Sequence, residues 1–328
     1  MVLRFIPDDS TINFVGVRKF AYLFSALLVL ASVGLVMTKG LNFGIDFVGG
    51  TAIEIRVPET PDLAKLRGAL NDLKLGAVSI QEFGEKDDLL IRLPEQEAAI
   101  GAETLPDGTV VDPNKKAIEA VKAELDGFFK EAGAVEYRRI EFVGPQVGKE
   151  LKLKGLYAFL ASLAAMLVYI WFRFEWQFGV AALVALAHDS LATIGLFALT
   201  QMEFNLSTVA AILMVAGYSI NDTVVVFDRI RENLRKYKKK PLFELFNLSI
   251  NETLSRTIMT SFTTVLALVA LYLFGGEVIR GFVYALIFGI GVGTYSSIYV
   301  ASPILLLMNV RGGRVDSGSA DSQDEATA

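Results

Sequence analysis

The stretch Leu206–Phe227, LSTVAAILMVAGYSINDTVVVF, decides the fold. It has 22 residues, of which only Asp222 is ionisable. At 1.5 Å per residue, a helix of this length measures about 33 Å, which is enough to cross the hydrocarbon core of a bilayer, about 30 Å thick. The stretch therefore predicts a transmembrane helix that carries one carboxyl group.

Five further apolar runs of this kind flank it: Phe20–Met37, Leu156–Phe172, Phe178–Leu199, Thr257–Phe274 and Phe282–Met308. Hydrophobic residues make up 53% of the 328-residue chain and charged residues 20%, which excludes a disordered chain and a cytosolic enzyme. The absence of Cys excludes disulfides, thiolate catalysis and iron–sulfur ligation, and the single His excludes a multi-histidine metal site. The sequence predicts an α-helical polytopic membrane protein with six transmembrane helices.

Lysine and arginine set the predicted orientation. Outside Lys39–Lys154 the chain has 15 of them, and 14 fall on the cytoplasmic side when the N-terminus is placed there. Because cytoplasmic loops carry the excess of Lys and Arg, we expect residues 1–19 and 309–328 in the cytoplasm, the latter as a disordered tail, and residues 39–154 in the periplasm. A cleaved signal peptide is the alternative for the first run, but no A-x-A site closes it.

The segment Lys39–Lys154 predicts a folded domain inserted between the first and second helices. Its strand-like and helix-like pieces follow the order β-α-β-β-α-β of a ferredoxin-like α+β fold. In chain order they are Thr51–Val57, Pro61–Leu73, Val78–Phe83, Leu89–Leu93, Pro113–Lys130 and Val135–Val143, with Glu95–Val111 as an insertion. Gly49-Gly50 lacks the Lys-Ser/Thr of a phosphate-binding loop. We therefore expect Gly44, Gly49 and Gly50 to allow tight backbone packing, and the domain to bind or move rather than to catalyse.

Ionisable residues inside the predicted helices form the candidate functional site. A charge at bilayer depth costs about 2.5–3.5 kcal/mol on insertion scales, so it must face the bundle interior, find a partner or change its protonation state. Asp222 has Asn221 beside it and Tyr218 and Ser219 one helical turn before it. We expect Asp222 to take up and release a proton. The alternative is a permanently paired carboxylate that only fixes helix packing.

Three other ionisable residues belong to the same hypothesis. Arg256 begins the fifth helix, and because the fourth and fifth helices are antiparallel, its guanidinium can reach toward Asp222. A proton relay in which their separation changes is one interpretation, and a plain positive-inside anchor is the other. His188 and Asp189 in the third helix are candidates for an accessory proton relay, because an unperturbed His side chain titrates at about pH 6.5. The alternative is that they form a single structural hydrogen bond. Only one of these neighbours can point straight at Asp222.

Two further patterns concern packing. The basic cytoplasmic loop 228–256 ends in an amphipathic segment, Leu242–Ser255, whose apolar residues are available to lie on the membrane surface. In the sixth helix, within the helical region 156–308, Gly289 and Gly293 have the GxxxG spacing that predicts close helix approach. We expect no cofactor, no metal site and no enzymatic activity.

Several motifs resemble the SecF family of bacterial protein-export membrane subunits. LNFGIDFVGGT (Leu41–Thr51) is similar to its first signature, and VAGYSINDTVVVFDRIREN (Val215–Asn233) is similar to its second. Asn251–Ser261, Val143–Leu151 and Tyr295–Pro303 match as well. The resemblance covers residues 14–310 and implies a fold of the resistance-nodulation-division type.

The resemblance also implies a function. Members work with SecD and use the proton-motive force to complete export of unfolded proteins across the inner membrane, after the SecA ATPase and the SecYEG channel have begun translocation. The family's membrane aspartate falls on Asp222 and its arginine on Arg256, which implies a proton relay coupled to movement of the periplasmic domain. YajC is a further candidate partner, beside the exported polypeptide and the lipid bilayer. The net charge of −5 gives no indication of nucleic-acid binding.

Two other functions and one other coupling ion stay open at this point. A structural subunit would stabilise the translocase without handling protons, and a small-molecule exporter of the same general fold would need a larger outer region than 39–154. A carboxylate with nearby Asn, Ser and Thr oxygens could serve sodium as well as a proton.

Overall fold

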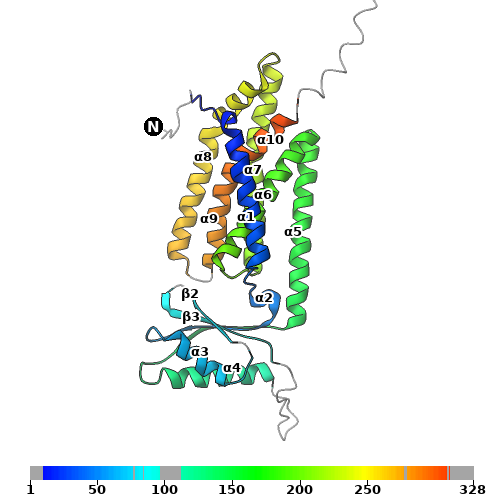
Figure 1. Cartoon of the computed structure of the whole chain (residues 1–328). Helices are drawn as coiled ribbons and strands as arrows, with labels where there is room; N and C mark the ends of the chain where they lie inside the picture. Colours follow the sequence, from blue (N-terminus) through cyan, green and yellow to red (C-terminus); the bar gives the residue numbers. More distant parts are fainter. Residues whose placement is uncertain are drawn as a thin grey trace, which may run out of the picture. The chain divides into compact units, whose positions relative to one another are not determined.

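The chain forms two compact units in a computed structural model that describes residues 10–76, 78–83, 85–96, 112–276, 279–308 and 310 (Figure 1). The helical unit consists of Met1–Asn42, Phe159–Met202 and Ser207–Ala328. The sheet unit consists of Phe43–Ala158 and the short segment Glu203–Leu206. All of the predicted tail 309–328 except residue 310, and all but the first two residues of the predicted insertion Glu95–Val111, lie outside the described residues.

Long apolar helices make up the helical unit. Within the described residues, six helices are long and apolar enough to cross a membrane, which confirms the predicted membrane fold. A short 3-10 turn, η1 (Val15–Val17), precedes them. They are α1 (Arg18–Thr38), α5 (Pro145–Arg173), α6 (Trp176–Thr200), α7 (Leu206–Lys236), α8 (Leu242–Phe274) and α9 (Arg280–Ser296), the last continued by the π-helical turn η3 (Ser297–Ala301) and by α10 (Ser302–Leu307).

The segment predicted as a basic loop, 228–256, is helical over most of its length. Only residues 237–241 lie between α7 and α8. Leu245, Phe246 and Ile250 are at most 1% exposed and pack in one core cluster with Phe227 and Ile230 of α7. The prediction that this apolar face lies on the membrane surface was therefore wrong. An apolar stripe at helical spacing has the same sequence pattern whether lipid or another helix covers it.

The residues before α1 are held on the first turns of α8. The side chain of Asn247 accepts a hydrogen bond from the Val15 amide at 2.9 Å. The carbonyl oxygen of the Asn251 side chain accepts from the Ile12 amide at 3.0 Å and from the Ser10 hydroxyl at 2.8 Å. Its amide group donates to the Ile12 carbonyl at 2.8 Å. Two asparagines one turn apart thus fix the lead-in segment to α8.

Asn251→Ala should loosen this lead-in segment selectively. The substitution removes both hydrogen bonds to the Ile12 backbone, each worth about 1 kcal/mol net. We expect amide hydrogen exchange at residues 11–15 to become roughly tenfold faster, as measured by mass spectrometry of the protein in nanodiscs. Glu244→Ala, at an exposed position of the same helix, is the control and should leave the exchange unchanged. Equal exchange in wild type and Asn251→Ala would contradict the clamp.

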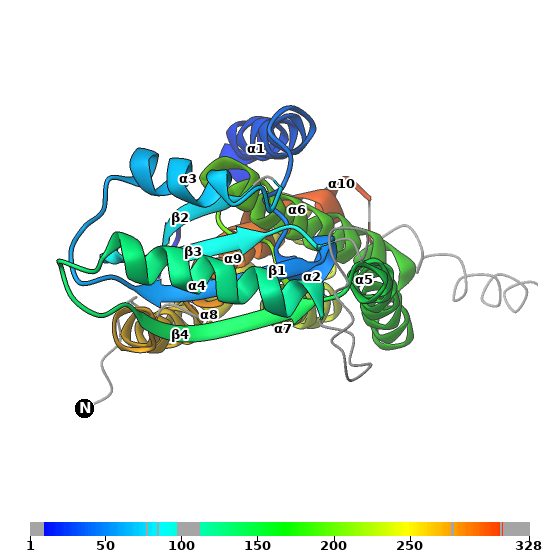
Figure 2. The same ribbon diagram turned by 90° about the horizontal axis from the view of Figure 1, so that it is seen from below.

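An antiparallel four-stranded sheet organises the other unit. Its strands are β1 (Gly50–Arg56), β2 (Ser79–Phe83), β3 (Glu85–Leu93) and β4 (Glu136–Val143), in the order β2-β3-β1-β4. Helices α3 (Leu63–Asp72) and α4 (Pro113–Phe128) cover one face (Figure 2). This order confirms the predicted ferredoxin-like fold.

Capping and alternation explain why these residues form these elements. The side chains of Asp62 and Asp112 accept hydrogen bonds from the first amides of α3 and α4, and Pro113 occupies the first position of α4. Alternate residues of the central strands then face the helices. The core beneath them comprises Ile53, Ile55, Leu89, Ile91, Leu66, Leu70, Val121 and Leu125. The short helix α2 (Ile45–Val48) places Ile45 against Ala52 and Leu90 on the opposite face.

The double glycine at the start of β1 has the packing role that the sequence predicts. Gly49 and Gly50 have φ angles of 79° and 110°, a region that side-chain-bearing residues rarely adopt. A Cβ atom on Gly50 would also overlap the carbonyl oxygen of Leu93 on β3. The pair therefore lets the chain turn into β1 directly against the neighbouring strand.

Glu54→Gln on β1 should stabilise the sheet unit at neutral pH. Burial raises the pKa of Glu54 above its ordinary value, although Arg139 opposes the shift from 3.8 Å. A raised folded-state pKa means that the protonated form contributes stability below the unfolded pKa of about 4.5, and that this contribution is lost as pH rises through the folded pKa. Glutamine, always neutral, should therefore gain less than about 1 kcal/mol at pH 7 and nothing at pH 4.

Hydrogen exchange of the β1 and β4 amides at matched pH measures this effect. Glu136→Gln is the control, because the side chain of Glu136 on β4 is 66% exposed. Faster exchange in Glu54→Gln than in wild type at pH 7 would show that the Arg139 pair outweighs burial.

Candidate functional site

Asp222 lies in the interior of the helical unit, where α7, α8 and α9 meet. It is 3% exposed. The Ser261 hydroxyl of α8 donates a hydrogen bond to its carboxyl at 3.5 Å, and the hydroxyls of Ser261 and Thr294 are 2.6 Å apart. Among the described residues, no Lys or Arg forms an ion pair with Asp222. The buried carboxyl thus has one hydroxyl partner, which lies beside a second hydroxyl.

Arg256 lies on the helix that faces Asp222 but does not touch it. It is exposed, five residues before Ser261 on α8. It borders a cavity of about 810 Å³ between α7 and α8, which Val225, one turn after Asp222, also borders. The structure therefore places Asp222 and Arg256 on adjacent helices, with a cavity reaching to within one turn of the carboxyl.

The cavity is rich in positive charge. Its acidic residues already have partners: Asp228 pairs with Arg173 at 3.0 Å, and Glu232 and Glu252 each pair with Arg229 at 2.7 Å. Within the described part of the chain, three cations on its wall have no carboxylate partner within 4 Å, namely Arg235, Lys236 and Arg256. A mobile anion or water can reach these cations from the open side of the cavity.

His188 and Asp189 form a second polar cluster. His188 Nδ1 is 2.9 Å from Asp189 Oδ1, and Asp189 is fully buried. The hydroxyls of Ser219 on α7 and Ser296 on α9 both donate to Asp189 Oδ2, at 2.5 and 2.7 Å. Ser219 therefore binds Asp189 rather than joining Asp222. Neither His188 nor Asp189 forms a hydrogen bond with Asp222.

The other predicted accessory residues lie apart from both carboxyl groups. The Tyr218 hydroxyl is 3.3 Å from the Thr264 hydroxyl of α8, and Asn221 is exposed on α7. The sequence alone did not indicate Ser261 as the partner of Asp222, Thr294 as the neighbour of Ser261, or Ser296 as a partner of Asp189. The hydroxyl-rich run around Ser261 in the fifth span was the signal that could have indicated the first of these partners.

Small residues bring α9 close to α7 beside these clusters. A Cβ atom on Gly289 would overlap the side chain of Val215, and one on Gly293 would lie 3.0 Å from Cβ of Ser219. Gly289 leaves no room for a Cβ atom and Gly293 leaves little, so the predicted role of the GxxxG motif in helix packing is confirmed.

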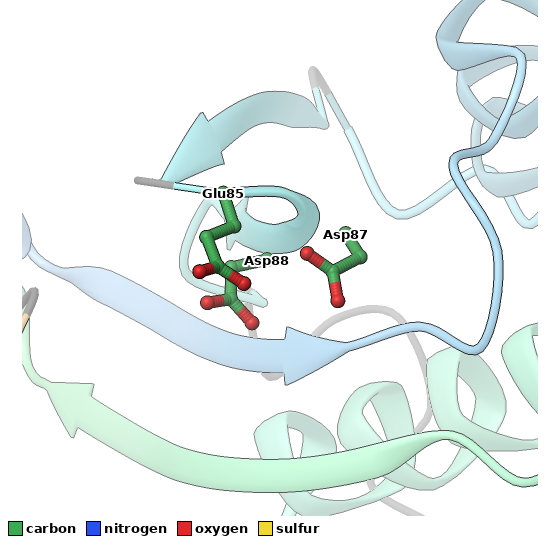
Figure 3. Close-up of side chains that lie close together, drawn as sticks. All are labelled: Glu85, Asp87 and Asp88. Carbon is green, nitrogen blue, oxygen red and sulfur yellow. The ribbon is translucent and has the colours of Figure 1, made fainter.

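A cluster of three acidic residues in the sheet unit has the spacing of a metal site (Figure 3). Glu85, Asp87 and Asp88 are close together at the start of β3. Arg56 is 2.8 Å from Glu85 and 2.7 Å from Asp88, and Arg138 is 3.1 Å from Asp88. The hydrogen bond to Asp88 raises the pKa of Arg56. Two guanidinium groups thus balance these carboxylates, as in a surface ion-pair network.

Comparisons with family models and with known proteins all indicate the same family. The model of the C-terminal region of the protein export membrane proteins SecD and SecF matches residues 123–311, and the model of the SecD/SecF GG motif matches residues 34–57. The chain is 48% identical to the protein translocase subunit SecF of Rickettsia felis over 93% of this chain and 94% of that protein. It is 47% identical to the SecF subunit of Rickettsia prowazekii, with 93% of each chain covered.

Solved structures agree with the sequence matches. The crystal structure of SecDF, a translocon-associated membrane protein from Thermus thermophilus, superimposes on 94% of this chain with a TM-score of 0.79 and 37% identity. A super-membrane-facing form of SecDF gives a TM-score of 0.66. The chain spans only 39% of the SecDF chain. With its six membrane helices, its ferredoxin-like unit and its GG motif, the chain belongs to the SecD/SecF family as a SecF subunit of the protein translocase.

Proposed function

We propose that this subunit, together with SecD, uses the proton-motive force to complete the export of unfolded proteins across the bacterial inner membrane. Asp222 takes up and releases the proton, and Arg256 changes its separation from Asp222 during the cycle. The resulting shift in helix packing moves the domain formed by residues 39–154. Both termini lie in the cytoplasm and this domain lies in the periplasm, where it meets the chain that SecA and SecYEG have begun to translocate.

The observation that carries this proposal is the surroundings of Asp222. A carboxyl that is 3% exposed inside a 31-residue membrane-spanning helix is costly to keep charged without a cation, which favours a residue that exchanges a proton. The hydrogen-bond partner of Asp222 is a hydroxyl, and hydroxyls can hand a proton onward. Arg256 is on the adjacent helix, on the wall of a cavity that begins one turn away. Asp222 thus supplies a proton carrier, Arg256 supplies a partner cation, and the cavity supplies a route for water.

The test uses inverted membrane vesicles that contain SecYEG, SecD and this chain. Export of a secreted reporter is started with SecA and then stopped by removing ATP, and an inside-acidic proton gradient is imposed. We expect the gradient to raise the fraction of fully translocated reporter, and vesicles without this chain to show no rise. Equal completion with and without the gradient would overturn energy coupling and would favour a purely structural subunit.

A second arm identifies the ion. The proton gradient is collapsed with a protonophore while a sodium gradient is imposed. We expect completion to fall to the level without any gradient. Completion that survives on sodium alone would replace the proton by sodium in this proposal, because a carboxyl with hydroxyl neighbours can serve either ion.

A further inference from the structure

We infer that His188 and Asp189 form a second proton-binding site, separate from Asp222, in which Nε2 of His188 is the accepting atom. The pair lies in the middle of α6, with His188 5% exposed and Asp189 0% exposed. This site goes beyond the proposed export function, because it binds a proton whether or not Asp222 couples export to the gradient.

The hydrogen bonds of Asp189 define the state of the pair. Both serine hydroxyls donate to Oδ2, and the ring nitrogen Nδ1 of His188 is 2.9 Å from Oδ1. Two hydroxyl donors on one oxygen, with a ring nitrogen beside the other, suit an ionised carboxylate. We assign the hydrogen of the neutral ring to Nδ1, where it can donate to Asp189, and this assignment leaves a lone pair on Nε2.

That lone pair is what distinguishes this site from a static hydrogen bond. Nε2 of His188 is buried and has no hydrogen-bond partner among the described residues. Protonation of Nε2 converts the ring to an imidazolium beside the carboxylate. The pair then changes from a net charge of −1 to zero. Inside a membrane this removes the cost of an uncompensated buried charge, and the positive ring gains a partner at 2.9 Å.

The groups that contact the pair from neighbouring helices do not compete for the proton. From α7 the contact is Ser219, and from α9 the contacts are Ser296 and the ring of Tyr295, 6.2 Å from the imidazole. The Tyr295 hydroxyl is engaged with Ser25 and the Ala21 carbonyl of α1. No Lys, Arg or further carboxyl group is among the described contacts of the pair. One proton on the pair therefore changes the net charge of this cluster by one.

The backbone next to the pair is irregular. Ser296 is the last residue of α9 before the π-helical turn η3, and the hydroxyl of Ser302, the first residue of α10, donates to the carbonyl of Ser297. Single π-helical turns inside α-helices occur frequently at functional sites. The charge of the pair therefore acts on a helix that already departs from regular geometry.

The single histidine of the chain makes the test direct. The full chain, labelled with ¹⁵N-histidine and purified with a histidine-free tag, is reconstituted in bilayers with unlabelled SecD. Solid-state NMR then follows the two ring nitrogens from about pH 5 to pH 9. We expect an Nδ1–H neutral ring at the alkaline end and a doubly protonated ring at the acidic end. A ring that stays neutral over the whole range overturns the proposal.

Asp189→Asn tests whether the carboxylate is part of the site. The substitution removes the negative charge, and we expect proton binding at His188 to become at least about tenfold weaker. An unchanged titration overturns the pair as the binding unit. If Asp189→Asn does not fold, the wild-type titration alone decides. The titration involves no export, so its result is independent of the vesicle experiment above.

Discussion

Asp222→Asn is expected to leave the translocase assembled and to abolish its response to a proton gradient. Asparagine matches aspartate in size, and its side-chain oxygen can still accept the hydrogen bond from Ser261. It cannot take up or release a proton. In the vesicle experiment, completion with the gradient should fall to the level without it, while the amount of protein in the membrane stays at the wild-type level.

Asp228→Asn is the matched control for this prediction. It makes the same chemical change six residues later on α7, where Asp228 pairs with Arg173 at a site that is 44% exposed. Exposed ion pairs contribute little, about 0–1 kcal/mol, so gradient-driven completion should persist. Normal completion in a well-expressed Asp222→Asn would reject Asp222 as the carrier and leave it as a packing residue.

Gly289→Ala should separate α9 from α7 and disturb both carboxyl clusters. The added methyl group would overlap Val215, and overpacking of this kind costs about 1–3 kcal/mol. Relief of the overlap moves α9, which carries Thr294 near Asp222 and Ser296 at Asp189. We expect a lower thermal midpoint in nanodiscs, faster amide exchange in α7 and α9, and reduced gradient-driven export.

Gly291→Ala is the control for this helix. Gly291 lies two residues along α9, is exposed, and has no atom within 4 Å of the position that a Cβ would take. Alanine there should leave stability unchanged or raise it by up to about 1 kcal/mol, because alanine favours helix more than glycine. Equal behaviour of the two alanine variants would show that the GxxxG contact does not set the distance between α7 and α9.

Periodicity and composition predicted the two units of this protein. Six apolar runs gave the membrane helices, and the β-α-β-β-α-β order gave the sheet unit, because both patterns depend on local spacing. The same spacing could not show what covers the apolar face of Leu242–Ser255. Contact with lipid and contact with the end of α7 both require apolar residues there, and only the structure shows which of the two covers this face.

The hydrogen-bond partners of the buried carboxyl groups could not be predicted from the sequence either. A position on a helix fixes the direction of a side chain, but the residue opposite depends on how the helices pack. Ser219 lies one turn before Asp222 along α7, yet it binds Asp189 of α6. Ser261 is the partner of Asp222 because the packing of α8 against α7 places the Ser261 hydroxyl beside the carboxyl.

The division of the chain into two units has a mechanical consequence. The backbone passes from one unit to the other at four places, after residues 42, 158, 202 and 206. One of these crossings leads directly into α7, the helix that carries Asp222. In the proposed cycle, α7 is therefore linked by continuous backbone to the Glu203–Leu206 segment of the sheet unit.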